Sequence, residues 1–89
     1  MKNNGHVLAT SLNYLKIRIV ELWRCKILTG SVPWDYQDLM TACCKDYQVR
    51  TGESCDTVAS ITPLEEWYDN LSNAQKEAMK TEYAFVPVP

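Results

Sequence analysis

Apolar side chains recur at helical spacing between residues 11 and 28, in the run SLNYLKIRIVELWRCKIL. At about 100° per residue most of them fall on one broad stripe, which we expect to face the core. The stripe consists of Leu12, Leu15, Ile19, Leu22, Trp23 and Ile27, with Val20 at its edge. Thr10 or Ser11 can cap the start, and Gly30 suits the position just after the end. The pattern predicts a helix to about Leu28 or Thr29, with a short strand around KIRIV as the competing interpretation.

A second periodic segment runs from roughly Pro33 to Val49 and is predicted to be a helix ending near Thr51 and Gly52. Pro33 suits a first turn, where its missing N–H is not needed. The apolar face of this helix would consist of Tyr36, Leu39, Met40, Cys43, Cys44 and Tyr47.

Two further helix starts are indicated by capping sequences. Thr62, Pro63 and Glu65 have the spacing of a capping box and predict a short third helix to about Asn70 or Leu71. Ser72 and Gln75 have the same spacing and predict a fourth helix to about Tyr83. Residues 52–61 carry no clear period, and the sequence does not determine whether the bond before Pro63 is cis or trans.

The predicted fold is all-α: a small bundle of three to four helices with an extended, Pro-containing C-terminal tail. We expect a flexible leader over residues 1–10, a single helical domain over 11–84 and an extended tail over 85–89, where Val and Pro alternate. A chain of 89 residues has the length of one small domain, whose stability margin is thin.

The first helix carries apolar residues on nearly its whole circumference, and such helices are usually central in a fold. One interpretation is that the short helices and the tail cover its outer face. The other is that this face binds a partner or a second copy of the chain. The candidate partner-binding residues are Tyr14, Ile17, Arg18, Arg24 and Leu28 on the helix, and Phe85, Val86 and Val88 on the tail.

Charge is unevenly distributed along the chain. Residues 1–30 hold five basic residues against one acidic residue, a net of +4, whereas residues 31–89 hold four against ten, a net of −6. The cations of the first helix are spread around its axis, and the second helix is acidic through Asp35, Asp38 and Asp46. Both features disfavour direct nucleic-acid binding, which requires basic groups converging on phosphates. It is kept as an alternative function.

No residue pattern predicts an enzyme, a metal site or a cofactor. The four cysteines, Cys25, Cys43, Cys44 and Cys55, lack zinc-ligand spacing, and the single histidine, His6, lies in the leader. We expect the cysteines to be reduced and to pack as small apolar residues. The chain has neither a secretory leader nor a stretch apolar enough to span a bilayer, so we expect a cytoplasmic protein without a membrane partner.

A very short helical chain, rich in Trp and Cys and without catalytic motifs, resembles small bacteriophage or mobile-element accessory proteins in general style. No particular residue carries this likeness. It implies a non-enzymatic protein–protein interaction module that binds and inhibits or modifies a larger host enzyme, for example one that processes DNA. The alternatives are a nucleic-acid binder that uses the basic first helix and a homo-oligomeric assembly component.

Overall fold

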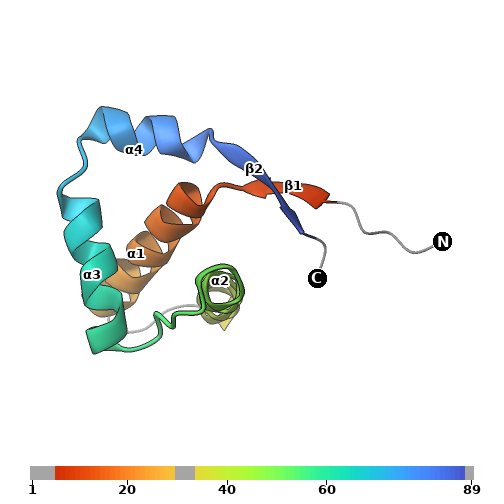
Figure 1. The fold of residues 1–89 in the computed structure, drawn as a ribbon. Helices are drawn as coiled ribbons and strands as arrows, with labels where there is room; N and C mark the ends of the chain where they lie inside the picture. The colour runs from red at the N-terminus through yellow and green to blue at the C-terminus, as the bar shows by residue number, and fades with distance from the viewer. Residues whose placement is uncertain (1–5, 30–33, 88–89) are drawn as a thin grey trace.

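Helix α1 is the element against which the other helices pack. The computed structural model describes residues 6–29 and 34–87, although not the side chains of residues 6, 7, 26–29, 34–36, 86 and 87. The elements within these ranges are β1 (His6–Thr10), α1 (Leu12–Thr29), α2 (Trp34–Thr51), α3 (Val58–Asp69), α4 (Asn73–Lys80) and β2 (Tyr83–Pro87). Helices α2, α3 and α4 each contact α1, and β1 and β2 form a ribbon that projects from the helical body (Figure 1). The predicted all-α bundle is confirmed, with this small ribbon in addition.

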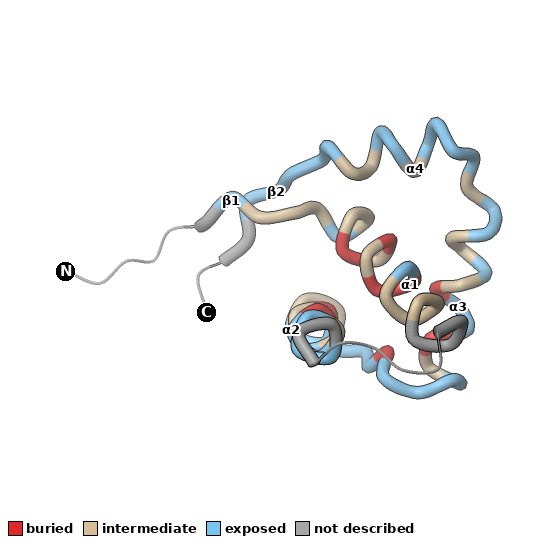
Figure 2. The backbone as a smooth tube through the Cα atoms, turned by 180° about the vertical axis from the view of Figure 1, so that it is seen from behind, coloured by how far each residue is buried: buried red, intermediate tan, exposed pale blue. Residues whose placement is uncertain are grey.

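The main core lies where α1, α2 and α3 meet (Figure 2). Its buried residues are Leu15, Ile19 and Val20 of α1, Cys43 and Tyr47 of α2, Cys55 of the connection, and Ile61 and Leu64 of α3. Leu22, Trp23, Met40, Cys44 and Tyr68 pack against them and are partly buried. The predicted apolar stripe is confirmed for most of its described members, whereas Leu12 is 39% exposed. The side chains of Ile27 and Tyr36 lie outside the described residues.

The second apolar side of α1 is covered by α3 and α4. Ile17 is 0% exposed, although it does not belong to the main core cluster. It shares its side of α1 with Glu21 and Arg24. The Glu21 carboxylate contacts Tyr68 of α3 and Lys80 of α4. The Arg24 guanidinium contacts Glu65 of α3. The expectation that Ile17 is available to a partner is therefore wrong, because the residue is buried within the chain. The tail, which was expected to share in covering this helix with the short helices, is paired in the ribbon instead over residues 85–87.

Three of the predicted helix ends are found at the expected residues. Ser11 caps α1, because its hydroxyl oxygen accepts a hydrogen bond from the Tyr14 N–H at 3.1 Å. Gly52 follows α2 directly and has φ +77°. This is the left-handed conformation that commonly ends a helix, and glycine adopts it without steric cost. Ser72 and Gln75 form the predicted capping box of α4.

The predicted start of the third helix is wrong by about one turn. Helix α3 begins at Val58, with Thr57 and Ser60 forming its capping box, so Pro63 lies inside the helix. Pro63 has a trans peptide bond and cannot donate to the Ala59 carbonyl, which belongs to an exposed residue that water can reach. The cap at Thr57 was missed because its partner is Ser instead of the usual Glu or Gln.

The chain ends differ most from expectation. Residues 6–10 are not a flexible leader but form β1, which pairs antiparallel with β2, and residues 1–5 lie outside the described ranges. Helix α4 ends at Lys80 instead of near Tyr83, because Tyr83–Pro87 forms β2. The predicted extended tail is therefore extended over residues 85–87 but paired in a sheet. None of the described helices combines the length and the apolarity that crossing a bilayer requires.

Replacing Ile17 by alanine should lower the free energy of unfolding by about 2–5 kcal/mol, because a fully buried side chain leaves a cavity. Urea denaturation followed by circular dichroism measures this loss. Val49→Ala is the matched control, since Val49 is 72% exposed on α2, and it should change the stability by no more than about 0.5 kcal/mol. Equal effects of the two substitutions would contradict the burial of Ile17 beneath α3 and α4.

Candidate functional site

Arg24, predicted to face a partner, binds carboxylates of α3 instead. Its Nε lies 3.0 Å from Oε1 of Glu65, and its Nη1 lies 2.9 Å from Oδ1 of Asp69. A second hydrogen bond joins Nη2 to Oδ2 of Asp69 at 2.9 Å, so this pair is bidentate. These hydrogen bonds raise the pKa of Arg24, and the same guanidinium lowers the pKa of Asp69. The prediction that Arg24 contributes to a docking face is not supported by this geometry, because the residue holds α3 against α1.

Arg18 and Lys16, the other cations of α1 whose side chains are described, also lie against groups of the chain itself. The Arg18 guanidinium lies 5.9 Å from the centre of the Tyr14 ring, and both residues are half-buried. The Lys16 ammonium lies 4.0 Å from the centre of the Trp67 ring of α3, and burial lowers the pKa of Lys16. The contacts resemble cation–π pairs, which orient a basic side chain along its aromatic neighbour. The predicted residues on α1 whose side chains the structure describes therefore do not form one exposed face.

The ribbon exposes large apolar side chains on one of its faces. Leu8 lies directly opposite Phe85, and Thr10 lies opposite Tyr83. Side chains of opposed residues, and of residues two apart on a strand, point to the same face of a sheet. Leu8, Tyr83 and Phe85 are 61%, 58% and 71% exposed, respectively. We call this set of three residues the ribbon face. Of the predicted partner-binding residues, Phe85 belongs to it, whereas the side chains of Leu28, Val86 and Val88 lie outside the described residues.

The outer edge of β2 is a second feature of the ribbon. The Ser11 N–H donates to the Glu82 carbonyl at 3.2 Å, which extends the ladder by one hydrogen-bonded pair. Hydrogen-bonded and non-hydrogen-bonded pairs alternate along an antiparallel ladder, so this pair fixes which of the other residues face the partner strand. Ala9 and Ala84 are then a hydrogen-bonded pair, and Tyr83 and Phe85 turn their backbone N–H and C=O groups outward. On β1 the outward carbonyl of Thr10 accepts a hydrogen bond from Arg50 Nη1 at 2.8 Å. The edge of β2 is built from the uncharged residues of the sequence YAFVP.

The base of the ribbon is fixed to the helical body. Arg50 of α2, which donates to the Thr10 carbonyl, is itself held by Asp46 at 3.0 Å. Just before β2, the Glu82 carboxylate accepts a hydrogen bond from the hydroxyl of Ser11, the residue that caps α1, at 3.3 Å. The ribbon therefore projects from a defined position, and its two strands extend beyond the helices (Figure 1).

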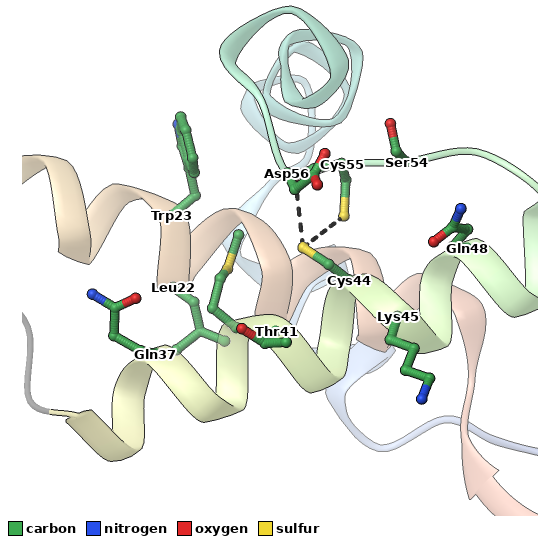
Figure 3. A pocket seen from close by; sticks show the side chains of 11 residues that line it. Leu22, Trp23, Gln37, Thr41, Cys44, Lys45, Gln48, Ser54, Cys55 and Asp56 are labelled. Atoms are coloured by element: carbon green, nitrogen blue, oxygen red, sulfur yellow. Dashed lines mark hydrogen bonds between the residues drawn. The ribbon is translucent and has the colours of Figure 1, made fainter.

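A pocket of about 320 Å³ lies between α1, α2 and the connection from α2 to α3. Leu22 and Met40 contribute apolar walls, and Gln48 and Asp56 contribute polar groups. Figure 3 shows that the sulfur atoms of Cys44 and Cys55 face each other at this pocket, and they are 3.0 Å apart. Within the described residues, no group of three or more His, Cys, Asp or Glu side chains is arranged to hold a metal ion.

Two features of these sites were missed by sequence reasoning. Leu8 and Tyr83 belong to segments that were assigned to the leader and to the end of a helix, so their shared face could not be recognised. Cys44 and Cys55 are separated by ten residues, and no local period indicates that their side chains meet. The available signal was weak: two short stretches rich in β-branched and aromatic residues, one near each end of the chain.

Comparison with known proteins gives no relative. No protein-family model matches the chain, and no curated protein or solved structure matches it either.

The ion pair between Arg24 and Asp69 predicts an acid-sensitive contribution to stability. Because the pKa of Asp69 is lowered in the folded protein, its contribution is complete above the ordinary value of 3.8 and is lost as the pH falls through the folded-state pKa. Asp69→Asn should lower the urea midpoint at neutral pH, and the difference from the unmodified protein should shrink as the pH falls below 3.8. Glu66→Gln, which alters an exposed carboxylate of the same helix, should show a much smaller difference. A difference for Asp69→Asn that is constant with pH would contradict the ion pair's role.

Proposed function

We propose that this chain is a small, non-enzymatic protein–protein interaction module that binds a larger host protein through the ribbon face. The observation that supports the proposal is the exposure of Leu8, Tyr83 and Phe85 on one side of a projecting two-stranded ribbon. An isolated ribbon of two strands is marginally stable in water, and it gains stability when its apolar face is covered. The general likeness to phage and mobile-element accessory proteins suggests that the partner is a host enzyme which the chain inhibits or modifies.

The exposed edge of β2 suggests what kind of partner surface the ribbon would bind. Outward backbone groups of Tyr83 and Phe85 can hydrogen-bond to an added strand, and alternate side chains can enter apolar pockets. Natural edge strands are usually protected by charged side chains, proline, bulges or covering segments, and β2 has a proline only at its last residue, Pro87. The five residues of β2 include no charged residue, which favours binding to an apolar groove or a sheet edge of the partner.

Nucleic-acid binding receives less support than at the sequence level. Arg24 is bound by Glu65 and Asp69, and Lys16 lies over the Trp67 ring, so these cations would have to leave internal partners to reach phosphates. A salt-titrated binding assay with duplex DNA and single-stranded RNA should therefore detect no association at physiological ionic strength. Salt-sensitive binding that is weakened by Arg18→Ala would favour the basic helix as the functional surface instead.

The proposal is tested by comparing two equally exposed apolar positions. Phe85→Asp introduces a charge on the ribbon face, whereas Val49→Asp introduces one on α2, where Val49 is 72% exposed. Proteins captured from host cell extract by the unmodified chain should also be captured by the Val49 variant and lost with the Phe85 variant. With the purified partner, Phe85→Asp should weaken binding at least about tenfold, because large aromatic side chains dominate interface energies.

Sedimentation of the purified chain separates the proposed partner from self-association. We expect the purified chain to be a monomer and the Phe85 variant to sediment at the same rate. If the chain forms a discrete oligomer that Phe85→Asp dissociates, the ribbon face binds a second copy of the chain and not a host partner. Equal capture by both variants would show that the ribbon face is not the contact surface.

A further inference from the structure

Two thiols that are distant in sequence meet at the edge of the core. Cys44 lies on α2 and Cys55 on the connection to α3, and their sulfur atoms are 3.0 Å apart. Sulfur atoms in a disulfide are about 2.0 Å apart, so an approach of about 1 Å would join them. Cys44 also donates a longer hydrogen bond to the Cys55 carbonyl, with 3.7 Å between sulfur and oxygen. Both thiols are reduced in this structure.

The fold holds this pair in place from both ends of the connection. Gly52 ends α2 in the left-handed conformation, and its N–H donates to the Gln48 carbonyl at 2.8 Å. At the other end, Thr57 caps α3 through its capping box with Ser60. Cys55 itself is 0% exposed and belongs to the main core. The geometry of the two sulfur atoms therefore follows from the packing of the connection and not from a flexible loop.

We propose that Cys44 and Cys55 form a thiol–disulfide exchange site, which a low-molecular-mass disulfide such as glutathione disulfide oxidises to an intramolecular disulfide. Cytosolic disulfides, where they occur, are usually transient and redox-sensing. The site would thus give the chain a reversible redox-dependent modification, and it does not depend on the ribbon face or on the proposed function.

The reaction balances as two exchange steps. The Cys44 thiol releases its proton to water, and its sulfur attacks one sulfur of glutathione disulfide, so that the glutathione S–S bond breaks and one glutathione leaves. The Cys55 sulfur then attacks Cys44 Sγ, the mixed disulfide breaks, and the proton of the Cys55 thiol passes to the departing sulfur of the second glutathione. The first glutathione leaves as a thiolate that takes up a proton from water, so the number of protons is unchanged. The two protein thiols together lose two electrons, which reduce the glutathione disulfide.

The surroundings assign the two cysteines different roles. Both cysteines line the pocket, but Cys44 is half-buried whereas Cys55 is 0% exposed, so Cys44 is the thiol that a reagent can approach (Figure 3). Cys55 is buried, and its pKa is raised by this burial and by its hydrogen bond to Cys44. Because a thiolate and not a thiol is the nucleophile, Cys55 is suited to the second, intramolecular step. The adjacent Cys43 is buried in the main core, where burial raises its pKa as well.

Peptide mapping of the full chain tests the proposal. The protein is incubated with glutathione disulfide, the remaining thiols are alkylated, and the chain is digested with trypsin. Cleavage after Lys26, Lys45, Arg50 and Lys76 places Cys44 in the peptide of residues 27–45 and Cys55 in that of residues 51–76. We expect these two peptides to be linked, with an intact mass lower by two hydrogen atoms. Dithiothreitol should separate them, and the oxidised chain should melt at least about 5 °C higher than the reduced chain.

The neighbouring cysteine provides the matched control. Cys44→Ser should abolish the linked peptides, whereas Cys43→Ser should retain them, and circular dichroism verifies that both variants are folded. Fragmentation of the linked peptides from the unmodified chain identifies the bonded cysteine without any substitution. The proposal is overturned if the link runs through Cys43, if only a stable glutathione adduct on Cys44 is found, or if both thiols remain reduced.

Discussion

Helix α1 bears large apolar side chains on two sides, and a chain of 89 residues has few other segments with which to cover them. The fold meets this constraint with α2 and the start of α3 on one side and the rest of α3 with α4 on the other. Leu15, Ile19 and Val20 enter the main core, while Ile17 is buried separately beneath the short helices. Each short helix is too brief to be stable alone, so its persistence depends on packing against α1.

The charged residues of α1 belong to the same arrangement. Arg24 joins α1 to α3 through two carboxylates, and Glu21 joins it to α3 and α4 through the Tyr68 hydroxyl and the Lys80 ammonium. Half-exposed ion pairs of this kind contribute little individually. Their value is positional, because they link α3 and α4 to the side of α1 that carries Ile17. A surface that looks basic in the sequence is therefore largely an internal interface.

The features that suggest function are the ribbon and a thiol pair at the edge of the core. The ribbon leaves the helices with three exposed apolar side chains, although its base is fastened by Arg50 and Ser11. The thiol pair lies at the margin of the core, beside a pocket and on a connection with caps at both ends. A projecting apolar surface whose base is held by hydrogen bonds to the helical body suits recognition, because its position is already fixed when a partner binds.

The sequence by itself determined the helical class, the apolar stripe of α1, and the caps at Gly52 and Ser72, and it limited the cap of α1 to Thr10 or Ser11. These features depend on periodicity and on neighbours within one turn. The sequence also indicated that α1 needs cover on two sides. Only the tertiary structure decided that α3 and α4 provide this cover, that residues 6–10 pair with residues 83–87, and that Cys44 meets Cys55. These outcomes join segments far apart in the chain, and no local period or propensity encodes which distant segments will meet.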